Sequence, residues 1–263
     1  MRPVSTAALA AALLAALPVA TLGQDMMRHV NLSSPAMTEA ELTRAQVEAR
    51  LAAATADKPA DFTNASLNGL DLSALDLSGA VFRAARLNKA NLKGANLTGA
   101  VLDQAWMLSA DLTRATLAKA SLFQAQLIGA KLDGADLRGA RVAANLTKAS
   151  LQGAKLVGAN LAADMRNQSM GLMGGVLKSA NLAGADFSKA DLAHAVLEFA
   201  NLSGADLTGA NLTSAQLDGA NLTGARVGGA NFSKADVDSA KLIDLEGEAN
   251  FNQAKNLELA VRH

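Results

Sequence analysis

Bulky apolar residues recur at every fifth position through most of the chain, a spacing that fits neither a helix nor a flat strand. They occupy seventeen consecutive fifth positions from Phe62 to Val142, mostly as leucine. On a helix, five residues turn the chain by about 500°, so successive leucines would spiral around the axis. In a strand, side chains alternate with a period of two, and every second leucine would point to water. The pattern therefore predicts a chain that bends once in each repeat.

The residues around each leucine indicate where the bend lies. Alanine stands two positions before most leucines, with a polar residue between them, and two small or polar residues follow, as in ANLTG at 95–99. Alanine and leucine two residues apart share an inward face, whereas small and polar residues are typical of corners. Five-residue sides would then wind around one axis, with leucine and alanine inside and the polar residues outside.

These repeats resemble those of the pentapeptide-repeat proteins, whose motif is A-[DN]-L-x-x. The chain contains ADLTR, ANLKG, ANLTG, ADLRG, ADFSK and ANLSG, and the resemblance covers residues 61–245. It implies an all-β solenoid, a right-handed quadrilateral parallel β-helix of about nine coils stacked about 4.8 Å apart. Residues 20 apart in sequence then become neighbours. The expected amide ladders are Asn181 with Asn201 and Asn221, and Asn211 with Asn231.

The five-residue frame slips twice. After Val142 the next leucine comes four residues later, at Leu146, which predicts a tightened corner. The motif then dissolves over residues 162–176, and a loop is expected there, either functional, as in gyrase-protecting family members, or a plain bulge. The candidate loop residues are Asp164, Met165, Arg166, Asn167, Gln168, Ser169 and Met170.

Residues 1–23 are typical of a cleaved secretory signal peptide. Arg2 precedes an apolar run of 14 residues at 7–20, and small residues follow. Spanning a bilayer takes roughly 20 apolar residues, so we expect no stable membrane anchor after cleavage. The prediction is a periplasmic or secreted bacterial protein, with a disordered alanine-rich tail as the alternative interpretation.

Short segments flank the repeats on both sides. Segment 24–60 is expected to contain one helix, at 39–54, because Thr38 and Glu41 have the spacing of a capping box. This helix either caps the open end of the solenoid or docks a partner. Segment 246–263 is expected to cap the other end, with one helical turn at 257–263. Gyrase-protecting relatives dimerise through a C-terminal element, which makes a homodimer a further possibility.

Composition and charge narrow the function. Aromatic residues make up only 3% of the chain, cysteine is absent, and the three histidines are scattered. We therefore expect no enzyme activity, no cofactor and no metal site. Lys and Arg total 24 against 24 Asp and Glu, a balance that offers no field to attract nucleic acid. The best-understood family members mimic DNA and bind gyrase, which requires a strongly negative surface. Gyrase inhibition or protection is therefore the alternative function, disfavoured by the neutral charge and the signal peptide.

One group of apolar residues breaks the rule that outward positions are polar. The candidate partner patch consists of Trp106, Leu108, Phe123 and Ile128. Leu108 and Ile128 are 20 residues apart and should stack, and Phe123 lies one side away. Such a cluster often marks a partner surface; alternatively, the side chains lie flat on the coil or are covered by a terminal segment. The sequence thus predicts a non-catalytic, exported scaffold for an unknown protein partner.

Overall fold

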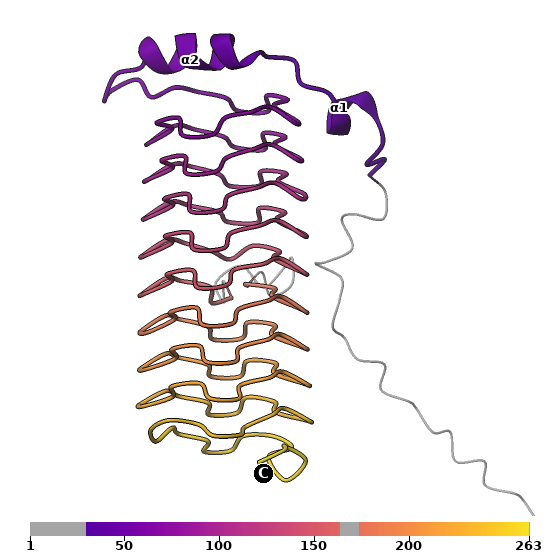
Figure 1. Ribbon diagram of the computed structural model, residues 1–263, viewed down its shortest axis with the longest axis vertical. Helices are drawn as coiled ribbons and strands as arrows, with labels where there is room; N and C mark the ends of the chain where they lie inside the picture. The colour runs from indigo at the N-terminus through magenta and orange to yellow at the C-terminus, as the bar shows by residue number, and fades with distance from the viewer. Residues whose placement is uncertain (1–29, 164–173, 263) are drawn as a thin grey trace, which may run out of the picture.

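The chain forms a straight stack of similar coils (Figure 1). The computed structural model describes residues 30–163 and 174–262. Parallel bridges join each coil to the next, from the Asp61–Val81 pair to the Lys241–Val261 pair. Within these described ranges, every β element is an isolated bridge and not a longer strand. The regular structure is therefore one bridge for each side of each coil.

A single repeat shows how the chain turns. Leu97 is buried, and the outward Asn96 beside it is half-buried. The Oδ1 atom of Asn96 accepts hydrogen bonds from the backbone N–H of Thr98 at 3.1 Å and from its hydroxyl at 2.7 Å. Gly99 follows with φ of 65°, and the Ala100 N–H donates to the Leu97 carbonyl at 3.0 Å. These bonds close the corner, so the predicted bend is confirmed, and the outward Asn stabilises it.

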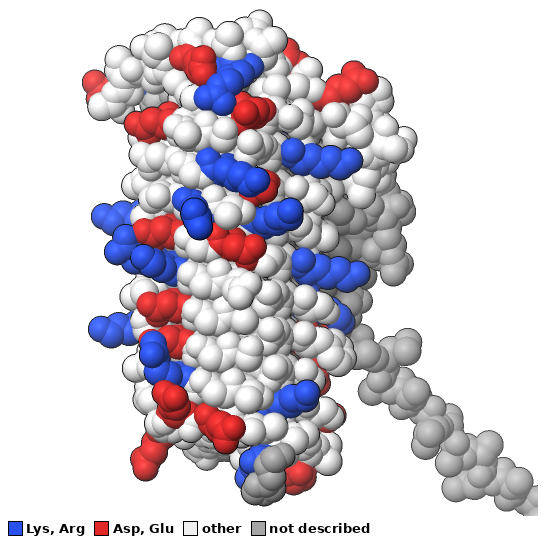
Figure 2. Space-filling model, in the orientation of Figure 1, with Lys and Arg blue, Asp and Glu red and all other residues white. Residues whose placement is uncertain are grey.

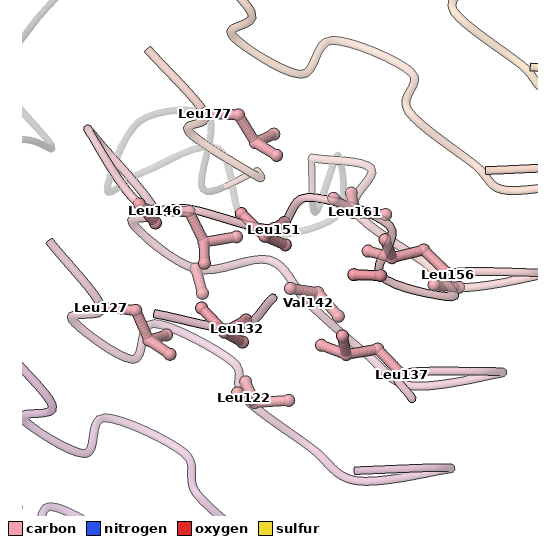
Figure 3. Packing of buried hydrophobic residues seen from close by; sticks show 14 of the residues in the cluster. Leu122, Leu127, Leu132, Leu137, Val142, Leu146, Leu151, Leu156, Leu161 and Leu177 are labelled. Carbon is pink, nitrogen blue, oxygen red and sulfur yellow. The ribbon is translucent and has the colours of Figure 1, made fainter. Parts of the chain in front are cut away.

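Leucine and alanine side chains fill the axis of the stack. Figure 3 shows leucines of successive coils pointing inward and packing on one another. They belong to one continuous cluster that extends from Val47 to Leu242. Near the N-terminal end, Phe62 and Phe82 stack with ring centroids 5.0 Å apart. Each buried leucine contributes roughly 1.5 to 3 kcal/mol, so this column supplies the cohesion of a fold that has few aromatic residues.

The stack has four sides, which we name faces A to D in chain order. Each face consists of outward residues that bridge from coil to coil. The corner between two faces takes both letters, as in corner AB. Face A includes Val101, Ser121 and Arg141, face B includes Arg86, Trp106 and Gln126, face C includes Asp111, Asn201 and Asn221, and face D includes Asp136, Asp206 and Arg226.

Amide side chains form the predicted ladder on face C. Its rungs are Asn201 to Asn181 at 3.2 Å and Asn221 to Asn201 at 3.3 Å, with Nδ2 donating to Oδ1 in both. On face A, Asn211 and Asn231 are bridged through their backbones. The Asn231 amide, however, donates to the Thr213 hydroxyl at 3.1 Å. The second expected ladder is therefore altered, since a corner threonine takes the place of Asn211 as the acceptor.

Both frame slips lie at corner AB. The spacing of bridged residues falls from 20 to 19 where Gln126 pairs with Asn145. There the Ala144 N–H donates to the Val142 carbonyl at 2.8 Å, across two residues instead of the usual three. The predicted tightened corner is thus confirmed. The register then jumps by 31 residues, from Asn145 to Val176. The candidate loop residues Asp164 to Met170 lie outside the described residues, as does the predicted signal peptide.

Helices α1 (Pro35–Thr38) and α2 (Arg44–Ala52) precede the coils, and α2 lies across the N-terminal end of the stack (Figure 1). The helix expected at 39–54 is therefore shorter and begins later than the sequence suggested. Its capping box joins Thr43 and Gln46, so the box expected at Thr38 and Glu41 was wrong. No helix in the described ranges is long and apolar enough to cross a membrane.

Pairing with the first coil explains the later start of α2. Ala40 forms an antiparallel bridge with Leu67, and the Glu41 N–H donates to the Ser66 carbonyl at 2.9 Å. The amide of Asn68 donates to the Glu39 carbonyl at 3.1 Å. These bonds hold residues 39–41 extended, and they satisfy backbone groups that a helix would otherwise use.

The last coil continues beyond residue 245, the boundary expected from the repeats. The Val261 N–H donates to the Ala240 carbonyl at 2.8 Å, and the Leu242 N–H donates to the Val261 carbonyl at 2.7 Å. The helical turn expected at 257–263 is not formed in its described part, 257–262. The open edge of the preceding coil offers backbone partners that a short helix in water lacks.

Candidate partner-binding surface

Packed leucine and alanine occupy the axis of this rod, so the surface open to other molecules is its outer wall and its two ends. Among the described residues, no group of three or more His, Asp or Glu side chains is placed to hold a metal ion. A hollow of about 540 Å³ lies at the C-terminal end, lined by Leu257, Glu258, Ala260 and Arg262. The candidate surface predicted from the sequence lies instead on the sides of the rod.

The structure brings the four residues of the candidate partner patch together around face B. Trp106 lies on face B and bridges to Arg86. Phe123 lies at corner AB, and Leu108 and Ile128 occupy successive coils at corner BC. All four side chains are half-buried. They thus lie partly against the coil and still present apolar area to solvent on one side of the rod.

Cationic side chains flank this patch. The Arg141 guanidinium carbon lies 3.9 Å from the centre of the Phe123 ring, well within cation–π range. Arg83 and Lys89 are exposed, and Arg86 is half-buried. The Nε atom of Arg86 is buried without a hydrogen-bond partner. In the described part of the chain, no ion pair includes Arg83, Arg86 or Lys89. Hydrogen bonds from Thr63 lower the pKa of Asp61 on face A, and the charge of Arg83 lowers it further.

Asp103 is the acidic residue beside this patch, and its carboxylate already accepts hydrogen bonds from the next coil. Asp103 lies at corner AB, between Arg83 and Phe123 in the stack. Its Oδ1 atom accepts hydrogen bonds from the Ser121 hydroxyl at 2.5 Å and from the Phe123 N–H at 3.1 Å. This carboxylate stabilises the corner, and it leaves the surrounding cations in excess.

Positive and negative residues are distributed unevenly along the rod, although their totals over the whole chain are equal. Residues 81–160 carry eleven Lys and Arg against four Asp and Glu, a net charge of +7. Residues 30–80 carry three against seven, and residues 174–262 carry seven against eleven, a net charge of −4 in each. On the face drawn in Figure 2, cations lie mostly over the upper and middle coils, and acidic residues gather toward the ends. The middle coils are therefore a basic belt between two acidic ends.

The acidic C-terminal end, residues 174–262, includes a stack of carboxylates at corner BC. Burial raises the pKa of the Asp218 carboxyl, and the charges of Asp236, Glu198 and Asp238 raise it further. Glu198 is partly neutralised, since the Lys178 Nζ atom lies 2.5 Å from its Oε2. Asp218 is thus a carboxylate that its surroundings destabilise in the charged form.

Most outward aspartates near the N-terminal end are stabilised in the charged form instead. Hydrogen bonds from the Ser73 side chain and backbone lower the pKa of Asp71. Corresponding bonds from Ser78 lower the pKa of Asp76. The N–H contacts measure 3.0 Å and 3.1 Å. These carboxylates close corners in the same way as Asn96 does, so they support the fold.

Phe199 is an exposed aromatic residue that the sequence analysis missed. It lies at corner BC, 60% exposed, with φ of 57°, a conformation that bulky residues rarely adopt. A Cβ atom on Gly219, one coil further on, would lie 2.6 Å from its ring, so the glycine provides the room that the ring occupies. The signal in the sequence was an aromatic residue in a corner slot that Gly, Ser and Lys fill in neighbouring repeats.

The sequence and the fold match known proteins. A family model described as pentapeptide repeats matches with eight copies, over residues 60–94, 76–113, 107–141, 143–162, 176–209 and 210–244. No curated protein sequence matches the chain.

Several solved structures are similar. HetL, a pentapeptide repeat protein involved in heterocyst differentiation regulation from the cyanobacterium Nostoc sp. strain PCC 7120, is 31% identical, with 81% of this chain and 94% of HetL covered and a TM-score of 0.38. A second pentapeptide repeat protein from Nostoc PCC 7120 is 38% identical over 45% of this chain and 78% of its own, with a TM-score of 0.30. Full-length QnrB1, a plasmid-mediated fluoroquinolone resistance protein, is 17% identical over 72% and 90%, with a TM-score of 0.44.

The family model covers more than half of the chain, and the identity with HetL extends over most of both proteins. The resemblance seen in the repeats is thereby confirmed, and the parallel bridges between successive coils form the four-sided β-helix that it implied. The chain belongs to the pentapeptide repeat family.

Proposed function

We propose that this protein is an exported, non-catalytic scaffold of about nine coils that binds another protein through face B. The observation that carries the proposal is the gathering of the only tryptophan with Leu108, Phe123 and Ile128 on one side of a rod whose other outward positions are mostly polar. Apolar side chains that face solvent together cost free energy unless a partner covers them.

The rigidity of the wall supports this role. Two backbone hydrogen bonds fix Trp106 to the preceding coil: its N–H donates to the Ala85 carbonyl at 2.8 Å, and its carbonyl accepts from the Leu87 N–H at 2.6 Å. Binding therefore needs little reordering of the backbone, which lowers the entropic cost of association. A fixed, partly apolar surface favours a folded or folding protein partner over a small molecule.

Export is the second part of the proposal and rests on residues 1–23. The basic start, the apolar run and the small residues that follow are those of a secretory signal. Cell fractionation and N-terminal sequencing test it. A mature protein that begins near residue 24 and occurs in the periplasm or medium supports export, whereas a full-length cytoplasmic protein overturns it.

A comparison of three baits tests the binding role. The mature protein, its Trp106→Ala/Ile128→Ser variant and a control variant, Thr116→Ala/Val157→Ser, are each used to capture proteins from periplasmic extract. The control changes two half-buried outward residues on face D and corner DA. We expect a partner that the wild type and the control capture and the face B variant loses. A partner captured equally by all three, or by none, contradicts the assignment of face B.

Gyrase inhibition or protection is kept as the second candidate function, because both ends of the rod carry a net negative charge. Protection or inhibition of gyrase supercoiling by purified mature protein would favour it over the scaffold. Light scattering on the same sample tests whether the protein forms a homodimer, which the sequence left as one possibility.

A further inference from the structure

We propose that the patch on face B receives an acidic protein segment that also carries apolar side chains. This inference rests on the proposed function and specifies the chemistry of the partner. The patch lies in the basic belt of residues 81–160, where cations outnumber anions by seven. An acidic partner is therefore attracted to this part of the rod and repelled by both ends.

Three cationic residues are placed to contact the carboxylates of such a segment. Arg83 stands at corner AB, Arg86 on face B and Lys89 at corner BC, so they span the width of the side that carries Trp106. In the described ranges none of these three takes part in an ion pair. Arg86 is half-buried, and its Nε atom lacks an acceptor within the coil.

The apolar residues lie directly beside these cations, toward the C-terminal end of the stack. Trp106 occupies the coil after Arg86, and Leu108 and Ile128 continue along corner BC. A segment that places carboxylates against Arg83 and Arg86 would therefore place its neighbouring side chains on Trp106 and Leu108. Acidic residues alternating with leucine or an aromatic residue match both parts of the surface.

The same geometry disfavours single-stranded nucleic acid as the occupant. Base stacking needs an open ring face, but the guanidinium of Arg141 already lies 3.9 Å from the centre of the Phe123 ring. Trp106 is half-buried on its coil. Leu108 and Ile128 offer apolar contacts that suit side chains better than phosphates. A protein segment uses all of these residues, whereas a nucleic acid would use only the cations.

A displayed library of random peptides tests this proposal with the folded mature protein as the target. We expect selected peptides to combine Asp or Glu with Leu, Phe or Trp, and their binding to weaken as salt screens the charges. The test variant is Arg83→Glu/Arg86→Glu. The control is Lys131→Glu/Lys155→Glu, which makes the same charge change in the same belt but on faces C and D. Circular dichroism checks that both variants fold.

We expect the selected peptides to bind the face B variant at least about tenfold more weakly than the wild type, and to bind the control nearly as well as the wild type. Equal losses in both variants would show attraction to net charge alone and overturn the site. Selection of basic or uncharged peptides, or tight binding of a single-stranded oligothymidine probe with no peptide selected, would overturn the partner chemistry. Binders that lose affinity only in the Trp106→Ala/Ile128→Ser variant would leave the scaffold function standing without the acidic partner.

Discussion

Replacing one core leucine tests whether the column inside the coils is filled. Leu132 is fully buried in the middle of the stack, among the leucines labelled in Figure 3. Leu132→Ala removes three carbon atoms, a loss of about 2.4 kcal/mol at about 0.8 kcal/mol for each. The cavity left behind adds to this, so we expect about 3 to 5 kcal/mol of lost unfolding free energy. The column should also tolerate no added volume, so Ala135→Leu should cost about 1 to 3 kcal/mol or more.

Guanidinium unfolding of the mature protein, followed by circular dichroism, measures both changes. Lys131→Ala is the matched control, since this exposed side chain precedes Leu132 and should change stability by less than about 0.5 kcal/mol. A cost of less than about 1 kcal/mol for Leu132→Ala, or a stable Ala135→Leu variant, would show unfilled space in the axis and refute the packed column.

Three further predictions concern the outer wall. Hydrogen bonds lower the pKa of Asp71 and Asp76 below the ordinary value of 3.8. The stability that these bonds add is therefore present above pH 3.8 and is lost as the pH falls through the lowered pKa values. The melting-temperature difference between wild type and Asp76→Asn should shrink over that range. Burial raises the pKa of Asp218, so its charged carboxylate destabilises the folded protein at neutral pH. Asp218→Asn should therefore raise the melting temperature at neutral pH, and it should have no effect below pH 3.8, where the carboxyl is protonated in both the folded and the unfolded protein. A lower melting temperature at neutral pH would contradict this. Gly219→Ala should destabilise the protein because of its φ of +64° and the Phe199 ring, and a double-mutant cycle with Phe199→Ala should recover the part of the loss due to the ring.

The sequence predicted the repeat geometry well because the residues that shape each repeat lie close together in the sequence. The inward Leu97, the outward polar Asn96 and the small corner residue Gly99 are all visible in five letters, and each lies where the repeat pattern predicted. The hydrogen bonds by which Asn96 closes the corner were seen only in the structure. The shortened corner after Val142 was likewise visible as one missing residue.

The ends of the stack could not be predicted in the same way, because their structure depends on bonds to distant residues. Thr38 and Glu41 have a helix-start spacing, but the segment there pairs with Ser66 and Leu67 of the first coil. Near the other end, Val261 bridges Lys241, since an open coil edge outweighs local helix tendency. Neither partner lies close in sequence, so a local pattern gives no sign of it.

The candidate surface was only partly visible. The apolar residues of the patch were found because they occupy outward slots, whereas the basic belt was hidden by a balanced total charge. Counting charges by coil instead of by chain reveals it, once the 20-residue register shows which residues share a coil. The stacking of Arg141 on Phe123 depends on side-chain conformation, so the sequence alone could not predict it.

Site-specific photo-cross-linking in living cells tests the central claim, that this rod works through face B, most directly. A benzophenone amino acid replaces Gln126, a half-buried residue of face B, or Thr116, a half-buried residue of face D. The account predicts a discrete cross-linked product with another protein from position 126 and none from position 116. Products from position 116 alone, equal products from both positions, or no product from either would contradict it.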